Sequence, residues 1–246
     1  MAPLAAMPPI TIDQADLQRF GARWIANRER LSRSRPESSM EFGNIFDAAV
    51  GRSIAAMLGG IPILIPNGRA LVAAQPDCVE VGPVRIIGGV RPQNFDVGYR
   101  PDGVRFAFDS KTLNDRESVG KNYQNMINDL ATEATTVHSR FPYALVAFMV
   151  IIPGPCLVQP QSAALIGTLE RLAQRKAVDD PLHFAEAISL VVWDPATGVI
   201  SPTTPGPDSP LRLEKFSPTV QATYLNRYKG LPPHAEAPED GADDGL

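Results

Sequence analysis

The sequence has 246 residues, of which 44% are hydrophobic and 20% are charged. Such a chain can bury one sizeable core, and its length fits one large domain better than two small ones. Cys78 and Cys156 lie far apart with no histidine or second cysteine at ligand spacing, which argues against a zinc site and a disulfide framework. The N-terminus lacks a basic region, and residues 144–152, the longest apolar run, are shorter than the roughly 20 residues that span a bilayer. These features predict a cytoplasmic protein without a membrane segment.

Charge is unevenly distributed along the chain, whose formal net charge is −4. Residues 231–246 hold five acids and no lysine or arginine, so the body of the chain is about neutral. This acidic tail lacks the apolar content to pack, and we expect it to be disordered. A neutral body also means that DNA binding would need a local basic patch.

The first predicted element is a helix over residues 11–30, in which apolar residues recur at helical spacing after an N-cap at Thr11 or Asp13. Six arginines between residues 19 and 35 make this the densest basic segment of the chain. Two interpretations of the segment stay open, a solvated helix face and contact with phosphate groups. Its candidate DNA-binding residues are Arg28, Arg30, Arg33 and Arg35.

A second helix is expected from Ser38 or Ser39 up to the glycine pair at residues 59–60, which would stop it. Its apolar residues recur at intervals of three and four, so one face is buried, and Glu41 lies in its first turn. Short apolar runs punctuated by proline and glycine follow and are typical of strands or hairpins. These runs cover residues 61–65, 69–74 and 79–87.

Two paired strands are expected over residues 94–99 and 104–112, because Pro-Asp-Gly at residues 101–103 is a strong turn signal. Residues 116–138 have a helical pattern, and residues 143–152 form the continuous apolar run of a strand buried on both faces. The last predicted elements are a helix over residues 161–176 and a buried strand over residues 188–193. This order predicts an α/β fold, with a central mixed β-sheet flanked by helices.

Asp96, Asp109 and Lys111 are the residues in which the pattern indicates chemistry. Counting back from the turn sets Asp96 roughly opposite Asp109, close enough for the two carboxylates to share a cation. Strand periodicity puts Lys111 on the same face as Asp109, with Ser110 on the opposite face. Mg²⁺ prefers such oxygen ligands, and it can neutralise a scissile phosphate and activate water. A lysine there can orient the water and stabilise developing charge.

The pattern resembles the motif of the PD-(D/E)XK nucleases, the restriction-endonuclease-like superfamily. The match reads Asn-Phe-Asp at residues 94–96, twelve intervening residues, and Asp-Ser-Lys at residues 109–111, with Phe95 where the family usually has a proline. In many members a glutamate on the helix before the hairpin approaches the metal, and Glu41 is the residue that corresponds. The resemblance implies a restriction-endonuclease-like core over about residues 37–195, within a single nuclease domain of residues 1–230.

The resemblance also implies a function, a Mg²⁺-dependent endonuclease that hydrolyses DNA phosphodiester bonds, with Mn²⁺ able to substitute. Its catalytic residues would be Asp96, Asp109, Lys111 and Glu41, of which the three acids would bind the metal. The family implies a type II restriction enzyme that acts as a homodimer on two-fold symmetric DNA. Two alternatives stay open, a nuclease subunit of a DNA repair or phage-defence complex and a catalytically silent DNA-binding member of the fold.

One face of the predicted helix over residues 116–138 adds candidate DNA contacts. Lys121, Gln124 and Asn128 lie at steps of three and four, so they share this face. Contact with DNA and plain solvation are both compatible with such a polar face.

Overall fold

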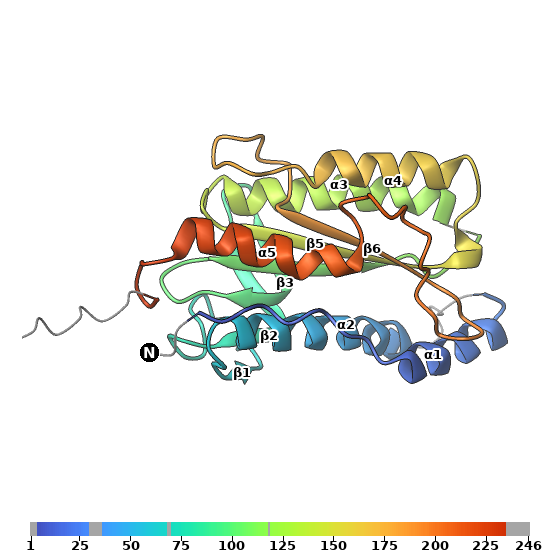
Figure 1. The fold of residues 1–246 in the computed structure, drawn as a ribbon, viewed down its shortest axis with the longest axis horizontal. Coiled ribbons are helices and arrows are strands. Elements are labelled where there is room, and N and C mark those ends of the chain that lie inside the picture. The colour runs from blue at the N-terminus through green and yellow to red at the C-terminus, as the bar shows by residue number, and fades with distance from the viewer. Residues whose placement is uncertain (1–3, 30–35, 68–69, 118, 235–246) are drawn as a thin grey trace, which may run out of the picture.

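The computed structural model of the protein describes residues 4–29, 36–67, 70–117 and 119–234. In this part of the chain six strands form one mixed sheet in the order β1-β2-β3-β4-β5-β6, with helices on both sides (Figure 1). The predicted α/β arrangement around a central mixed sheet is therefore confirmed. The elements in chain order are α1 (Gln14–Ala26), α2 (Pro36–Met57), β1 (Ile63–Leu64), β2 (Val79–Ile87), β3 (Pro92–Tyr99), β4 (Phe106–Thr112), α3 (Val119–His138), β5 (Leu145–Pro153), the 3₁₀ turn η1 (Gly154–Cys156), α4 (Gln161–Leu172), β6 (Ala187–Trp193) and α5 (Leu213–Tyr228).

The helices cover the sheet from two sides. In Figure 1, α1 and α2 lie below the sheet and α3 and α4 lie above it. α5 packs against β5 and β6. The Phe216 ring of α5 meets the Phe108 ring of β4 edge to face, with the ring centroids 6.1 Å apart. Within the described ranges, no helix combines the length and the apolar character needed to cross a membrane.

The central strands are apolar because both of their faces are covered. All nine residues of β5 and all seven residues of β6 are buried, as the continuous apolar runs predict. β4, β5 and β6 run parallel, whereas β3 is antiparallel to β2 and to β4. Parallel neighbours need a crossover connection, which α3 provides between β4 and β5 and α4 provides between β5 and β6.

The first two predicted helices are confirmed, although α1 ends at Ala26 rather than at residue 30 and α2 begins before its expected caps. The Asp13 side chain accepts a hydrogen bond from the Ala15 N–H at 2.8 Å and so caps α1. α2 begins at Pro36, before the expected caps Ser38 and Ser39, and these serines therefore lie inside the helix. Proline suits the first turn because its fixed φ is helical and an N–H there would have no intrahelical partner.

The segment before β2 differs from its predicted strands. Of residues 61–65, only Ile63–Leu64 form a strand, and residues 70–74 contain none. Leu71 and Val72 are exposed, so the apolar character of this run does not reflect burial in the sheet. The run forms an irregular loop instead.

The C-terminal part contains a helix that the sequence pattern does not predict. α5 buries Phe216, Val220, Tyr224 and Tyr228, although Pro218 lies inside it. The structure also differs from the expected start of the acidic tail at residue 231, because residues 231–234 contact the body of the protein. The remaining tail residues, 235–246, lie outside the described part.

Three hydrogen bonds join residues 231–234 to the rest of the protein, of which one runs from the Leu231 N–H to the carbonyl of Tyr228 at 3.1 Å. The Tyr224 hydroxyl and Nε2 of His234 are 2.7 Å apart, and the guanidinium of Arg105 donates to the carbonyl of Pro232. The His234 ring also lies beside the ring of Tyr99, with centroids 6.3 Å apart. These contacts join residues 231–234 to β3, to α5 and to Arg105, which precedes β4.

Removal of residues 231–246 should therefore destabilise the protein, whereas removal of residues 235–246 should not. The longer deletion loses these three hydrogen bonds, each worth about 1 kcal/mol, and about 1 kcal/mol shifts the melting temperature of a chain of this size by roughly 2–4 °C. Thermal unfolding of the two truncated chains, followed by circular dichroism, measures the difference. Equal melting temperatures would show that residues 231–234 contribute nothing.

Candidate active site

The candidate site lies where the pairing of β3 with β4 ends. The last pair in the ladder is Val97 with Phe108, and one step further the register would set Asp96 opposite Asp109. Instead of a further ladder bond, the Asp96 carboxylate accepts from the Ser110 backbone N–H at 2.9 Å and from the Ser110 hydroxyl at 3.2 Å. β4 continues beyond this point only with β5 as its partner. A side chain of β3 thus satisfies a backbone donor that the end of the ladder leaves free.

Asp109 and Lys111 form the part of the site that faces α3. The ammonium group of Lys111 donates to Asp109 and, at 2.9 Å, to Oε1 of Glu133 on α3. The Lys111 side chain is 22% exposed and that of Glu133 only 3%. Strand periodicity explains why Asp109 and Lys111 share this face, as the sequence predicts.

Asp47 forms the part of the site that faces α2. It is buried on α2, its Oδ1 has no hydrogen-bond partner, and it interacts with the Ser110 hydroxyl. Gly43, one turn earlier, also lies beside Ser110, since a Cβ there would make an ordinary van der Waals contact with Oγ of Ser110 at 3.6 Å. Ser110 therefore connects Asp47 with Asp96.

A cavity of about 650 Å³ opens on this side of the sheet. Asp47, Asp96 and Ser110 line it, and so does Thr112 at the end of β4. Met40 and Ile65, which also line it, are largely exposed. The cavity thus combines the buried carboxyl group of Asp47 and the half-buried one of Asp96 with an apolar rim, and it is large enough for part of a substrate.

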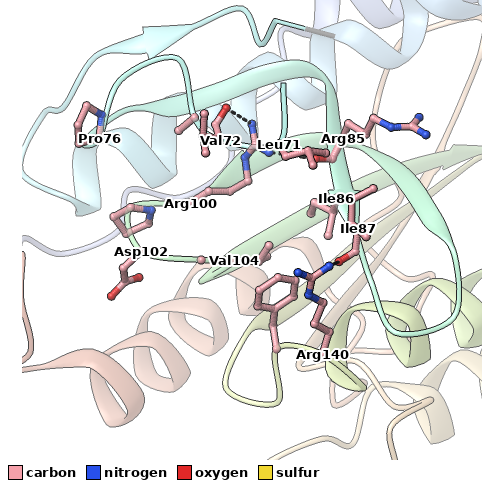
Figure 2. Close-up of a pocket in the computed structure, with 14 residues that line it drawn as sticks. Leu71, Val72, Pro76, Arg85, Ile86, Ile87, Arg100, Asp102, Val104 and Arg140 are labelled. Atoms are coloured by element: carbon pink, nitrogen blue, oxygen red, sulfur yellow. Dashed lines mark hydrogen bonds between the residues drawn. The ribbon is translucent and has the colours of Figure 1, made fainter. Parts of the chain in front are cut away.

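A second cavity, of about 550 Å³, lies among the β3–β4 turn, the loop before β2 and the end of α3 (Figure 2). The only guanidinium in it that is buried, that of Arg100, is neutralised by Glu80 through hydrogen bonds of 2.7 and 2.9 Å. Arg100 also donates to the carbonyl of Val72. This cavity contains none of Asp96, Asp109 and Lys111, and we do not assign the chemistry to it.

Burial and mutual repulsion favour the protonated forms of the carboxyl groups. Burial, together with hydrogen bonding to Asp109 and the charge of that group, raises the pKa of Asp96, and burial and Asp96 raise the pKa of Asp47. Burial also raises the pKa of Asp109 to about 6, against the opposing pull of Asp96 and Lys111. Burial disfavours the charged form of Lys111, but Asp109 and Glu133 outweigh it and raise the pKa of the ammonium group.

Of the predicted catalytic residues, the structure brings together Asp96, Asp109 and Lys111 but not Glu41. The Glu41 side chain is 49% exposed and pairs with Arg19 at 3.2 Å and with Arg23 at 3.0 Å. Glu41 lies six residues before Asp47, and at 100° per residue this puts the two side chains about 120° apart around the helix. Asp47 is therefore the acid of α2 that faces the site.

The predicted DNA-binding residues are exposed or lie outside the described part. Arg28 is exposed just after α1, in a left-handed backbone conformation with φ 55°. Gln124 and Asn128 are exposed on α3, as their shared polar face predicts. Arg30, Arg33 and Arg35 lie outside the described residues, as does the side chain of Lys121.

Sequence reasoning missed Asp47 and Glu133, although each interrupts an apolar pattern. Asp47 follows the buried Phe46 on α2, and Glu133 lies three residues after Leu130 and four before Val137, both buried on α3. An acid inside the apolar stripe of a helix is costly to bury unless it is paired or protonated. That cost is the signal that could have identified both residues.

The carboxylate oxygens of the site are suitable ligands for a hard divalent cation, although the acidic side chains are not grouped around a common position. Among the residues that the structure describes, no three histidine, cysteine or acidic side chains are grouped as a metal site. However, Oδ1 of Asp47 and Oε2 of Glu133 are buried without hydrogen-bond partners. Free carboxylate oxygens beside a second acid are what a magnesium site requires.

Comparisons with known proteins do not assign the chain to a family. No protein-family model matches it, and neither the curated proteins nor the solved structures yielded a match.

Replacing Asp47 with Asn should stabilise the metal-free protein at alkaline pH. A raised pKa means that the folded state holds the proton more tightly than the unfolded chain, so ionisation costs stability as the pH rises above about 3.9, the ordinary pKa of an aspartate. Near pH 9 we expect a gain of at least about 1 kcal/mol, or roughly 2–4 °C, that shrinks as the pH approaches 4. Thermal unfolding in chelator across this range, with the exposed Asp179→Asn as control, measures it. A gain that does not vary with pH would contradict this electrostatic account.

Proposed function

We propose that the protein is a Mg²⁺-dependent nuclease that hydrolyses DNA phosphodiester bonds, on a core of the restriction-endonuclease type. The observation that carries the proposal is the convergence of Asp96, Asp109 and Lys111 at the end of the β3–β4 ladder. Two carboxyl groups with raised pKa values beside a half-buried lysine are unusual outside functional sites. The central mixed sheet with helices on both faces is compatible with such a core.

Asp96 and Asp109 would hold the cation, with Asp47 as the third acid in place of the expected Glu41. Their close approach supports this assignment, because the negative charges that repel one another in the metal-free protein would be neutralised together. When bound, Mg²⁺ supplies charge neutralisation at the scissile phosphate and lowers the pKa of a bound water. Mn²⁺ can substitute, since it accepts the same oxygen ligands.

The chain's own residues contribute position and charge. The Ser110 N–H and hydroxyl fix one oxygen of Asp96, which leaves the other oxygen of that carboxylate for a further ligand. Lys111 presents a permanently charged ammonium group beside Asp109, where it can orient water and stabilise negative charge on the phosphate oxygens.

We further propose DNA as the substrate and a type II restriction enzyme acting as a homodimer as the biological form. The exposed polar face of α3, with Gln124 and Asn128, and the basic segment after α1 are the surfaces proposed to contact the duplex. Cutting of a plasmid into discrete fragments would support the restriction role. Indiscriminate degradation would favour a nuclease subunit of a larger complex, and binding without cutting would favour a silent member of the fold.

Replacement of the aspartates and replacement of the lysine should affect cleavage and metal binding differently. Asp96→Ala and Asp109→Ala should abolish cleavage and weaken metal binding together, because each removes a metal ligand. Lys111→Ala should slow cleavage by about 10²-fold or more while metal and DNA still bind, because it removes charge stabilisation only. Single-turnover cleavage of plasmid DNA with Mg²⁺, together with calorimetric metal titration, separates the two effects.

Exposed residues of the same types provide the controls. Asp179 and Lys176 are exposed on the surface after α4. The variants Asp179→Ala and Lys176→Ala should therefore cleave DNA at the wild-type rate. A folded Lys111→Ala protein that cuts as fast as the wild type would refute the catalytic assignment. A wild-type protein that cuts no DNA with either Mg²⁺ or Mn²⁺ would refute the proposed function as a whole.

A further inference from the structure

We propose that Glu133 is a positioning residue, which holds the ammonium group of Lys111 in the site with the help of Gln93. This inference rests on the proposed function for its catalytic consequence, but the contact between the side chains can be tested without it. Oε1 of Glu133 accepts from Lys111 at 2.9 Å and from Nε2 of Gln93 at 2.9 Å. One carboxylate oxygen thus receives a donor from each of two strands, β3 and β4.

The burial of Glu133 argues against an ordinary helix-face ion pair. An exposed pair between a lysine and an acid contributes little and is easily broken by water. The side chain of Glu133 is 3% exposed, and removing one partner of such a buried pair leaves an uncompensated charge. Glu133 lies in the apolar stripe of α3 between Leu130 and Val137, so the packing of the helix fixes its place.

Glu133 is needed to hold Lys111 because a bound cation would compete with Lys111 for the carboxylate of Asp109. In the metal-free protein Asp109 and Glu133 share the ammonium group of Lys111. A cation held by Asp109 would repel that ammonium group and compete with it for the same carboxylate. Glu133 is then the counter-charge that remains, and it keeps the lysine side chain, which has four rotatable bonds, in one place.

Gln93 and the second oxygen of Glu133 complete the arrangement. Gln93 lies at the start of β3, paired with Ile86 of β2, so its side chain is anchored by the sheet. Its amide fixes the rotation of the carboxylate by donating to Oε1. Oε2 of Glu133 is buried and has no hydrogen-bond partner, so Lys111 and Gln93 both donate to the same oxygen, Oε1.

The kinetic test is the replacement Glu133→Gln, which keeps the shape of the side chain and removes its charge. We expect the rate constant kcat for plasmid cleavage to fall about 10- to 100-fold, while KM for DNA and the half-saturating Mg²⁺ concentration change less than about twofold. Asp129→Asn, an exposed acid one turn earlier on α3, is the matched control and should leave all three values unchanged. Gln93→Ala should lower kcat by a smaller factor, about 3- to 10-fold. This second variant keeps the inference testable if Glu133→Gln does not fold.

A double-mutant cycle separates positioning from a structural role. If Glu133 acts through Lys111, then Glu133→Gln should have no further effect on kcat in a Lys111→Ala background. A multiplicative effect in the double variant, or an unchanged kcat in folded Glu133→Gln and Gln93→Ala proteins, would overturn the inference while leaving the proposed function in place.

Chemical labelling tests the contact even if the wild type cleaves no DNA. Brief acetylation followed by peptide mass spectrometry compares Lys111 with the exposed Lys176 in the same sample. We expect Lys111 to react at least about 10-fold faster, relative to Lys176, in folded Glu133→Gln than in the wild type, and Asp129→Asn to match the wild type. An unchanged ratio in both folded variants, Glu133→Gln and Gln93→Ala, would show that Glu133 does not hold the lysine.

Discussion

The hydrogen bond from the Ser110 N–H to the Asp96 carboxylate is the interaction on which the arrangement of the site depends. It replaces a ladder bond at the point where β3 and β4 separate, so it holds an acid of one strand against the backbone of the next. A peptide N–H buried without an acceptor would cost about 1–3 kcal/mol. The strands can separate here because the Asp96 side chain accepts the hydrogen bond from this N–H. The separation opens the sheet locally, and the carboxylate is held at the opening.

The central pair of acids was predictable because its geometry is local. Only residues 100–105 connect the two strands, and the register of their pairing sets Asp96 opposite Asp109. The acid contributed by α2 was not predictable in the same way, because the angular position of a helix on a sheet depends on distant packing. An acid in the first turn, such as Glu41, is favoured by the helix dipole without any further role. Asp47 lies deeper in the helix, where only burial distinguishes it.

The same distinction between local and distant constraints applies to the fold. β5 and β6 could be predicted from their apolar runs, whereas the loop over residues 70–74 is apolar without forming a strand. α5 was hidden by Pro218, which is unfavourable inside a helix because it lacks an N–H and crowds the preceding turn. Its apolar residues recur every four positions, and the packing of that stripe on β5 and β6 compensates for the proline.

The division of charge between the two sides of the sheet suggests where an external cation is needed. On the side of α3, the ammonium group of Lys111 lies between Asp109 and Glu133 and neutralises part of their charge. On the side of α2, no ion pair joins a described lysine or arginine to Asp47 or Asp96, and only Ser110 donates to the pair. Protonation can satisfy these two acids in the absence of metal, as their raised pKa values indicate. A divalent cation entering from the adjoining cavity would replace those protons, so metal binding and proton release should be linked in this protein.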